Sequence, residues 1–239
     1  MDMTKENIVR VLLENVPENQ LIFVNQYYQE NFSTELSEST YYRVIAKLTT
    51  EKFLCRIAKG IYYRPKISKY GLVPPSQSSI IDIFTKNNSG MVVGYPLYNR
   101  LNLTTQISKN IEVYSSILSQ KSMTIQNITV LYYDLTFTDE VIKTVQILDV
   151  LEHFNKIQDL NYHAFISYCK SFSTSYSDEI FYAVDKVFSY TKNTKSFLKS
   201  VLDYYGVPNT LNESLASLSN YTHPKTEDIY KAVTCEHSD

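Results

Sequence analysis

Tryptophan is absent from the 239-residue sequence, and glycine, with five residues, and cysteine, with three, are scarce. Neither a Walker loop nor a Gly-x-Gly-x-x-Gly motif is present, so no nucleotide cofactor is expected. The three widely spaced cysteines provide no disulfide framework, which favours a reducing cytoplasm. The apolar runs are far shorter than the roughly 20 residues of a membrane span, and the first residues do not form a signal peptide. We therefore expect a cytoplasmic protein with no membrane segment.

Motifs for enzymatic chemistry are also lacking. Asp82 and Glu112 resemble the carboxylates of a nuclease, but no lysine follows Glu112 at the usual spacing. The Asp-x-Asp pair with which a nucleotidyltransferase binds metal is absent. The four histidines lack zinc spacing, and we attribute the proximity of His223, Cys235 and His237 to chance. The sequence thus predicts a protein that is not an enzyme, with no catalytic residues, no cofactor and no metal.

Charge is distributed unevenly along the chain, although the net charge is only −2. Residues 43–69 contain eight basic residues and one acidic residue, a net charge of +7. Residues 71–239 contain 13 basic and 17 acidic residues, a net charge of −4. A basic segment on an otherwise acidic chain favours an anionic partner such as nucleic acid. A solvated surface that is rich in lysine by chance is the alternative.

The helix expected over residues 38–49, capped by Ser37, lies at the start of this basic segment. Apolar side chains recur along it with the spacing of one buried stripe: Tyr41, Val44, Ile45 and Leu48. The opposite face carries hydroxyl and basic side chains without a large aliphatic one: Ser39, Tyr42, Arg43, Ala46 and Thr50, with Thr40 and Lys47 on its flanks. Such a face can enter the major groove of DNA, where Arg and Lys read guanine edges.

A β-hairpin is expected next, because β-prone runs over residues 53–57 and 61–65 flank a short turn containing Gly60. With helices expected over 5–15 and 25–31, this order predicts a winged helix-turn-helix. The basic residues of the wing would contact the DNA backbone: Arg56, Lys59, Arg64 and Lys66. A winged helix that binds only protein is the alternative.

Three segments resemble a known family, the AbiEi-type antitoxins. They are the run from Arg56 to Lys66 (RIAKGIYYRPK), Gly71 with Pro74-Pro75-Ser76, and the run from Leu101 to Ile107 (LNLTTQI). The likeness continues in apolar patterns over 145–151 and 196–206. The resemblance implies a bacterial transcriptional regulator with an N-terminal winged helix, which represses its own promoter and often acts as a dimer on a paired operator. It also implies a nucleotidyltransferase-like partner toxin, AbiEii, in abortive-infection loci of toxin–antitoxin type IV.

The remaining chain predicts an α+β protein with an N-terminal winged helix-turn-helix, a small mixed α/β middle domain and a helical C-terminal region. We place these domains at 1–66, 67–136 and 137–239. Residues 65–76, with three of the seven prolines, are interpreted as a linker. The tail over 223–239 is polar and expected to fray.

These observations predict a DNA-binding repressor of its own toxin–antitoxin promoter, with double-stranded DNA as partner. A homodimer follows only from the resemblance, and the sequence leaves the oligomeric state open. The first rival hypothesis is a protein-binding antitoxin module that contacts its toxin through the C-terminal helices. The second is a metal-dependent nuclease using Asp82 and Glu112.

Overall fold

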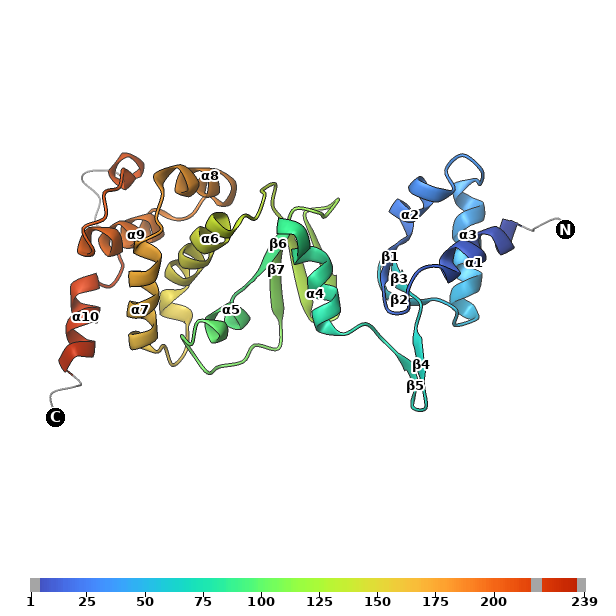
Figure 1. Ribbon diagram of the computed structural model, residues 1–239, viewed down its shortest axis with the longest axis horizontal. Helices are drawn as coiled ribbons and strands as arrows, with labels where there is room; N and C mark the ends of the chain where they lie inside the picture. The colour runs from blue at the N-terminus through green and yellow to red at the C-terminus, as the bar shows by residue number, and fades with distance from the viewer. Residues whose placement is uncertain (1–4, 216–220, 236–239) are drawn as a thin grey trace. The chain divides into compact units, whose positions relative to one another are not determined.

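The computed structural model describes residues 5–215 and 221–235, which form two units with separate hydrophobic cores (Figure 1). One unit comprises Met1–Ile83 with Thr124–Gln126, and the other comprises Phe84–Met123 with Asn127–Asp239. The predicted α+β class is confirmed, with an N-terminal winged helix-turn-helix, a mixed α/β region and a helical region. None of the described helices is long and apolar enough to cross a membrane.

The first unit is built from helices around a small antiparallel sheet. Its elements are α1 (Lys5–Glu14), β1 (Leu21–Phe23), α2 (Val24–Asn31), α3 (Glu38–Thr50), β2 (Cys55–Ala58) and β3 (Ile61–Tyr63). The strands lie in the order β1-β3-β2, so the predicted hairpin is present and β1 extends its sheet. A helix, a strand, two helices and a hairpin in this order make the winged helix.

Burial of one face of α3 holds this unit together. The predicted stripe is confirmed, since Tyr41, Val44, Ile45 and Leu48 are all buried. The Tyr41 ring packs against Phe32, with ring centroids 5.4 Å apart, inside the core formed by the three helices. Because the stripe fixes the rotation of α3 about its axis, the opposite face of α3 is directed to solvent.

A second hairpin occupies most of the segment that we interpreted as a linker, and that interpretation is wrong. Strands β4 (Lys66–Ser68) and β5 (Gly71–Val73) pair antiparallel as a two-stranded ribbon. Gly71 has a φ of +111°, a backbone conformation that favours glycine. Prolines flank the ribbon without entering its strands, so they delimit the hairpin and do not prevent it.

The second unit combines a mixed sheet with a helical layer. The strands of its sheet are β6 (Gly90–Val93), β7 (Ile111–Ser115), β8 (Ser122–Ile125) and β9 (Ile128–Tyr132), in the order β6-β7-β9-β8, with Thr124 and Ile125 of β8 grouped with the first unit. Strands β6 and β7 are antiparallel, and β7 and β9 are parallel. Its helices are α5 (Tyr95–Arg100), α6 (Asp139–Glu152), α7 (Tyr162–Ser173), α8 (Asp178–Phe188), α9 (Lys192–Tyr204) and α10 (Thr226–Cys235). Helix α4 (Gln77–Thr85) spans the boundary between the units, and the short 3-10 turns are Lys86–Asn88, Phe154–Lys156 and Leu211–Ser214.

One core connects the sheet and the helices of the second unit, and its buried side chains come from β6 as well as from α6 to α10. Helix α10 corrects the prediction of a frayed tail up to residue 235, and residues 236–239 of that tail lie outside the described residues. Its Ile229 is buried in this core, and Thr226 Oγ1 lies 2.7 Å from Ser200 Oγ on α9. A sequence that looks polar therefore folds as a helix, because Ile229 and Tyr230 pack against the core of the second unit.

A buried carboxylate, Asp149 on α6, joins the sheet and the helices of the second unit. Only 3% of this residue is exposed. The Gly94 backbone N–H donates a hydrogen bond to Asp149 Oδ2 at 3.4 Å, and the Tyr98 hydroxyl also hydrogen-bonds the carboxylate. His153 Nδ1 lies 3.4 Å from Asp149 Oδ1. Several donors thus converge on one acceptor, as burial of a carboxylate requires.

The imidazole beside this carboxylate makes stability depend on pH. The hydrogen bond to Asp149 raises the pKa of His153 above its ordinary value of 6.5, although partial burial and Lys156 oppose the change. A pKa raised by folding stabilises the folded state fully below the unfolded pKa, and this contribution is lost as pH rises through the folded pKa. We expect the free energy of unfolding to fall between about pH 6 and pH 8 in the wild-type protein.

Urea unfolding at the two pH values tests this expectation, with His153→Gln as the variant that cannot titrate. The fall in unfolding free energy between these pH values should be smaller in His153→Gln than in the wild type. An identical fall in both proteins would contradict the assignment to His153.

Candidate nucleic-acid interface

The outward face of α3 is the first part of the candidate interface. The helix begins at the predicted cap, where the Thr40 backbone N–H donates a hydrogen bond to Ser37 Oγ at 3.4 Å. Its exposed residues include Ser39, Tyr42, Arg43, Ala46, Lys47 and Thr50. The face therefore carries hydroxyls, an aromatic ring and two basic groups, which can bind base edges or phosphates. Thr40 is less available, because its Oγ1 accepts a hydrogen bond from Ser37 Oγ at 2.8 Å.

The two basic residues of this face differ in their surroundings. Lys47 Nζ lies 2.6 Å from Glu6 Oε1 and 4.0 Å from Glu51 Oε1, and its hydrogen bond to Glu6 raises the pKa of the ammonium group. Arg43 is exposed and, among the described residues, has no carboxylate partner. Arg43 is therefore the guanidinium on α3 that is free to bind another molecule.

The wing is the second part of the interface. The turn between β2 and β3 places Lys59 and Gly60 at its tip, and Gly60 has a φ of +75°. The Val24 backbone N–H donates to the Gly60 carbonyl at 3.0 Å, which fixes the tip against the start of α2. Lys59 and Arg56 are exposed beside this turn, and Arg56 Nε donates to the Ala58 carbonyl at 3.2 Å.

Arg64 takes a different role from the one expected of a wing residue. Its Nη1 donates to the carbonyl oxygens of Glu14 and Val16, at 2.6 Å for Val16, and its guanidinium lies 5.6 Å from the centre of the Phe53 ring. These contacts join β3 to the end of α1 and leave the group half-buried. We assign Arg64 to the fold of the winged helix and leave it out of the candidate interface.

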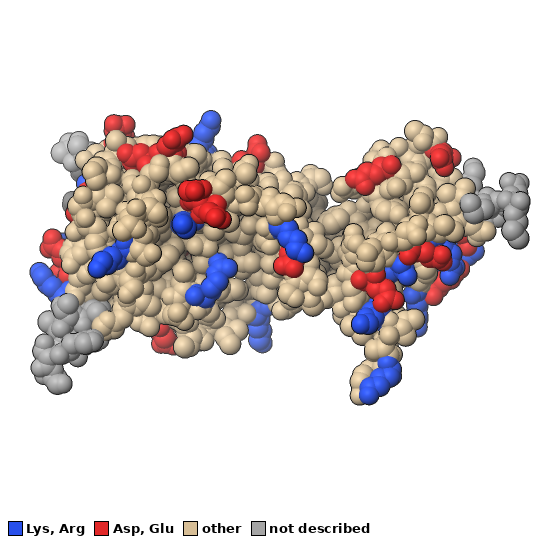
Figure 2. Space-filling view, viewed as in Figure 1, with Lys and Arg blue, Asp and Glu red and all other residues tan. Residues whose placement is uncertain are grey.

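Apart from Arg64, whose guanidinium binds backbone carbonyls, six basic residues of the first unit remain without a carboxylate partner among the described residues, and we call them the unpaired cations. They are Arg43, Lys52, Arg56, Lys59, Lys66 and Lys69. Basic and acidic groups pair where α1 meets α3, whereas the end of the β4–β5 hairpin shows basic groups and no acidic ones on the face drawn in Figure 2. The positive charge of residues 43–69 is therefore only partly neutralised within the protein, which favours an anionic partner.

Sequence reasoning missed the contribution of the β4–β5 hairpin beyond Lys66. Ile67 and Tyr70 are 76% and 89% exposed, and Lys69 Nζ lies 4.9 Å from the centre of the Tyr70 ring. The signal was present in the sequence, since two short β-prone runs flank a turn that ends in Gly71. The neighbouring prolines outweighed it in our interpretation.

The residues considered for metal chemistry belong to different units. Asp82 lies on α4 in the first unit and Glu112 on β7 in the second. Within residues 5–215 and 221–235, no group of three His, Cys, Asp or Glu side chains could hold a metal ion. Of the group that we attributed to chance, His223 is half-buried, while His237 and the side chain of Cys235 lie outside the described residues.

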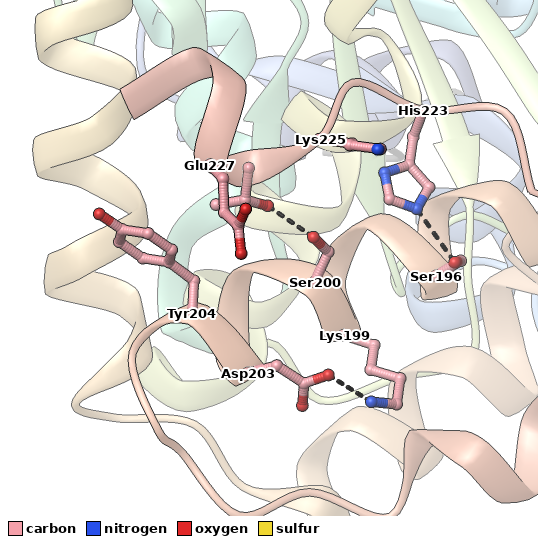
Figure 3. A pocket seen from close by; sticks show the side chains of 9 residues that line it. Ser196, Lys199, Ser200, Asp203, Tyr204, His223, Lys225 and Glu227 are labelled. Carbon is pink, nitrogen blue, oxygen red and sulfur yellow. Dashed lines mark hydrogen bonds and ion pairs between the residues drawn. The ribbon is translucent and has the colours of Figure 1, made fainter. Parts of the chain in front are cut away.

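A cavity of about 550 Å³ lies between α9 and the segment that leads into α10 (Figure 3). Its lining residues are Ser196, Lys199, Ser200, Asp203, Tyr204, His223, Lys225, Thr226 and Glu227. Much of this polar lining forms internal pairs: Ser196 Oγ with His223 Nε2 at 3.0 Å, Ser200 Oγ with Thr226 Oγ1 at 2.7 Å, and Lys199 with Asp203. The first two pairs fasten α9 to the segment that leads into α10 and to the start of α10, and the third lies within α9, so we assign them to the fold of the second unit.

Comparison with known proteins gives a family match without a known activity. A family model described as "Family of unknown function (DUF6088)" matches residues 8–159. A search of curated proteins found no match. The crystal structure of the RV2827C protein from Mycobacterium tuberculosis is similar over 84% of this chain and 76% of that chain, with 11% sequence identity and a TM-score of 0.44.

Proposed function

The chain belongs to the DUF6088 family, whose function is unknown, and from its own surface we propose that it is a DNA-binding transcriptional regulator. The observation that carries this proposal is the outward face of α3, with Arg43 lacking a carboxylate partner among the described residues, next to a wing that carries further unpaired cations. A helix with this face fits the major groove, and a basic wing fits the phosphates beside it.

In this mechanism α3 supplies the contacts that read sequence. Arg43 donates two hydrogen bonds to a guanine edge, and Ser39 and Tyr42 bind neighbouring bases or phosphates. Lys47 exchanges Glu6 for a phosphate when the helix enters the groove. Arg56, Lys59 and Lys66 bind the backbone, so affinity decreases steeply as salt concentration rises.

We further propose that the protein acts as an AbiEi-type antitoxin that represses its own promoter. The resemblance of residues 56–66 and 101–107 to that family supports this finer assignment. The same resemblance implies a dimer on a paired operator and a nucleotidyltransferase-like toxin encoded nearby. A footprint on the DNA upstream of its own coding sequence tests the proposal. We expect one or two protected sites, and the absence of protection at protein concentrations that saturate other repressors would contradict it.

The wing gives a separate prediction. Lys59→Ala should weaken binding to specific and scrambled DNA by the same factor. The slope of log K against log salt concentration should become shallower by about 1, because one phosphate contact is lost. Anisotropy titrations at several salt concentrations measure both quantities. Lys121→Ala, which removes an exposed lysine of the second unit, is the matched control. An unchanged salt dependence in Lys59→Ala would remove the wing from the mechanism.

A further inference from the structure

One face of the β4–β5 hairpin carries exposed apolar side chains. Ile67 and Leu72 are opposite each other in the register, so their side chains share a face of the ribbon. Both residues are exposed, and Tyr70 at the tip is 89% exposed. An isolated two-stranded ribbon buries too little surface to be stable by itself. Such a ribbon with exposed apolar side chains is typical of a segment that binds another molecule.

Hydrogen bonds attach the base of the hairpin to the winged helix, and a hydrogen bond within the turn stabilises its tip. The Asn19 backbone N–H donates to the Arg64 carbonyl at 2.8 Å, and the Lys66 backbone N–H donates to Asn19 Oδ1 at 3.4 Å. At the tip, the Tyr70 backbone N–H donates to Ser68 Oγ at 3.2 Å. The ribbon is thus preformed and anchored to the winged helix shortly after β3, which reduces the entropy cost of binding.

The chemistry of the hairpin favours DNA over a purely apolar partner. Its eight residues, 66–73, contain Lys66 and Lys69 and no carboxylate. The Lys69 ammonium lies 4.9 Å from the centre of the Tyr70 ring, so a cation accompanies the most exposed apolar group. A DNA groove offers both matching surfaces, since phosphates line its edges and sugars and bases form its walls and floor. Two-stranded ribbons and apolar wedges are both known to enter DNA grooves.

We propose that the β4–β5 hairpin is a second wing, which inserts Tyr70 into a DNA groove flanking the one held by α3, with Lys66 and Lys69 on its phosphates. This inference rests on the proposed function and extends it to a contact outside the helix-turn-helix. It predicts that the protein protects a longer DNA segment than α3 and the first wing cover by themselves.

The test compares three variants with the wild type on the protein's own upstream DNA. Lys69→Ala with Tyr70→Ser removes the side chains of the tip and keeps Ser68 and Gly71, which flank the turn. We expect this variant to bind the DNA about tenfold more weakly and to protect a shorter DNA segment. The slope of log K against log salt concentration should become shallower by about 1. Ile67→Ser with Leu72→Ser removes the apolar face and should weaken binding without changing the salt dependence.

The matched control is Lys121→Ala with Tyr132→Ser, an exposed lysine and tyrosine of the second unit whose backbones are joined by a 2.9 Å hydrogen bond. This control should bind as the wild type does, and circular dichroism should show that all variants are folded. Equal binding by the tip variant and the control would overturn the second wing and leave the proposed function intact.

Two other results separate the hairpin from the proposed function. A change in the oligomeric state of the free protein on Ile67→Ser with Leu72→Ser, with DNA binding unchanged, would overturn the proposal in favour of a protein contact. A wild-type protein that does not prefer its own DNA would overturn the proposed function, and with it the second wing.

Discussion

Arg43→Ala should reduce the free energy of binding to the specific site by about 1–3 kcal/mol, while binding to scrambled DNA changes much less. Arg43 is exposed on α3, on the side opposite the buried stripe, and has no carboxylate partner among the described residues. A guanidinium in this position can form two hydrogen bonds to a guanine, and alanine can form none. Alanine also favours the helix, so the fold of the first unit should persist.

Two further variants make this result interpretable. Arg43→Lys keeps the positive charge and loses the bidentate hydrogen bonds to guanine. This variant should therefore retain affinity for scrambled DNA and lose preference for the specific site. Arg100→Ala removes an exposed arginine of the second unit and should have no effect. Anisotropy titrations of each variant on both duplexes give the comparison. An equal loss on both duplexes would show that Arg43 binds only phosphate.

Asp149→Ala should lower the free energy of unfolding by about 3–5 kcal/mol, the largest effect we expect from a single substitution. The Gly94 N–H and the Tyr98 hydroxyl would remain at a buried position without their acceptor. Each buried donor without a partner costs about 1–3 kcal/mol, which explains the size of the effect.

Urea unfolding followed by circular dichroism measures this loss, and Tyr98→Phe is the control that removes one donor only. Tyr98→Phe should cost about 1 kcal/mol, because the carboxylate keeps its other partners. A loss below about 1 kcal/mol in Asp149→Ala would contradict the role of the carboxylate as the central acceptor. Since Asp149 lies in the second unit, the folded fraction of this variant should still bind DNA.

The features that the sequence predicts correctly depend on local patterns. The spacing of Tyr41, Val44, Ile45 and Leu48 gives the buried face of α3, and Ser37 marks its start. The turn with Gly60 gives the hairpin that follows. Periodicity and capping are properties of residues close in the chain, so they can be read without knowledge of the tertiary structure.

The features that the sequence could not reveal depend on contacts between distant residues. Lys47 pairs with Glu6, 41 positions away, and Arg64 binds carbonyls near the end of α1. A count of charges cannot distinguish these residues from the free Arg43. Helix α10 likewise depends on the burial of Ile229 against distant helices. Tertiary contacts therefore decide which basic residues remain available to a partner.

Fluorescence anisotropy of the protein with its own upstream DNA, against a scrambled duplex at several salt concentrations, tests the central claim most directly. A sequence-specific repressor should prefer its own DNA by a factor of about 10³ or more, with both affinities decreasing as salt rises. Equal or absent binding to the two duplexes would contradict DNA recognition by α3, and the winged helix would then be assigned to protein contacts.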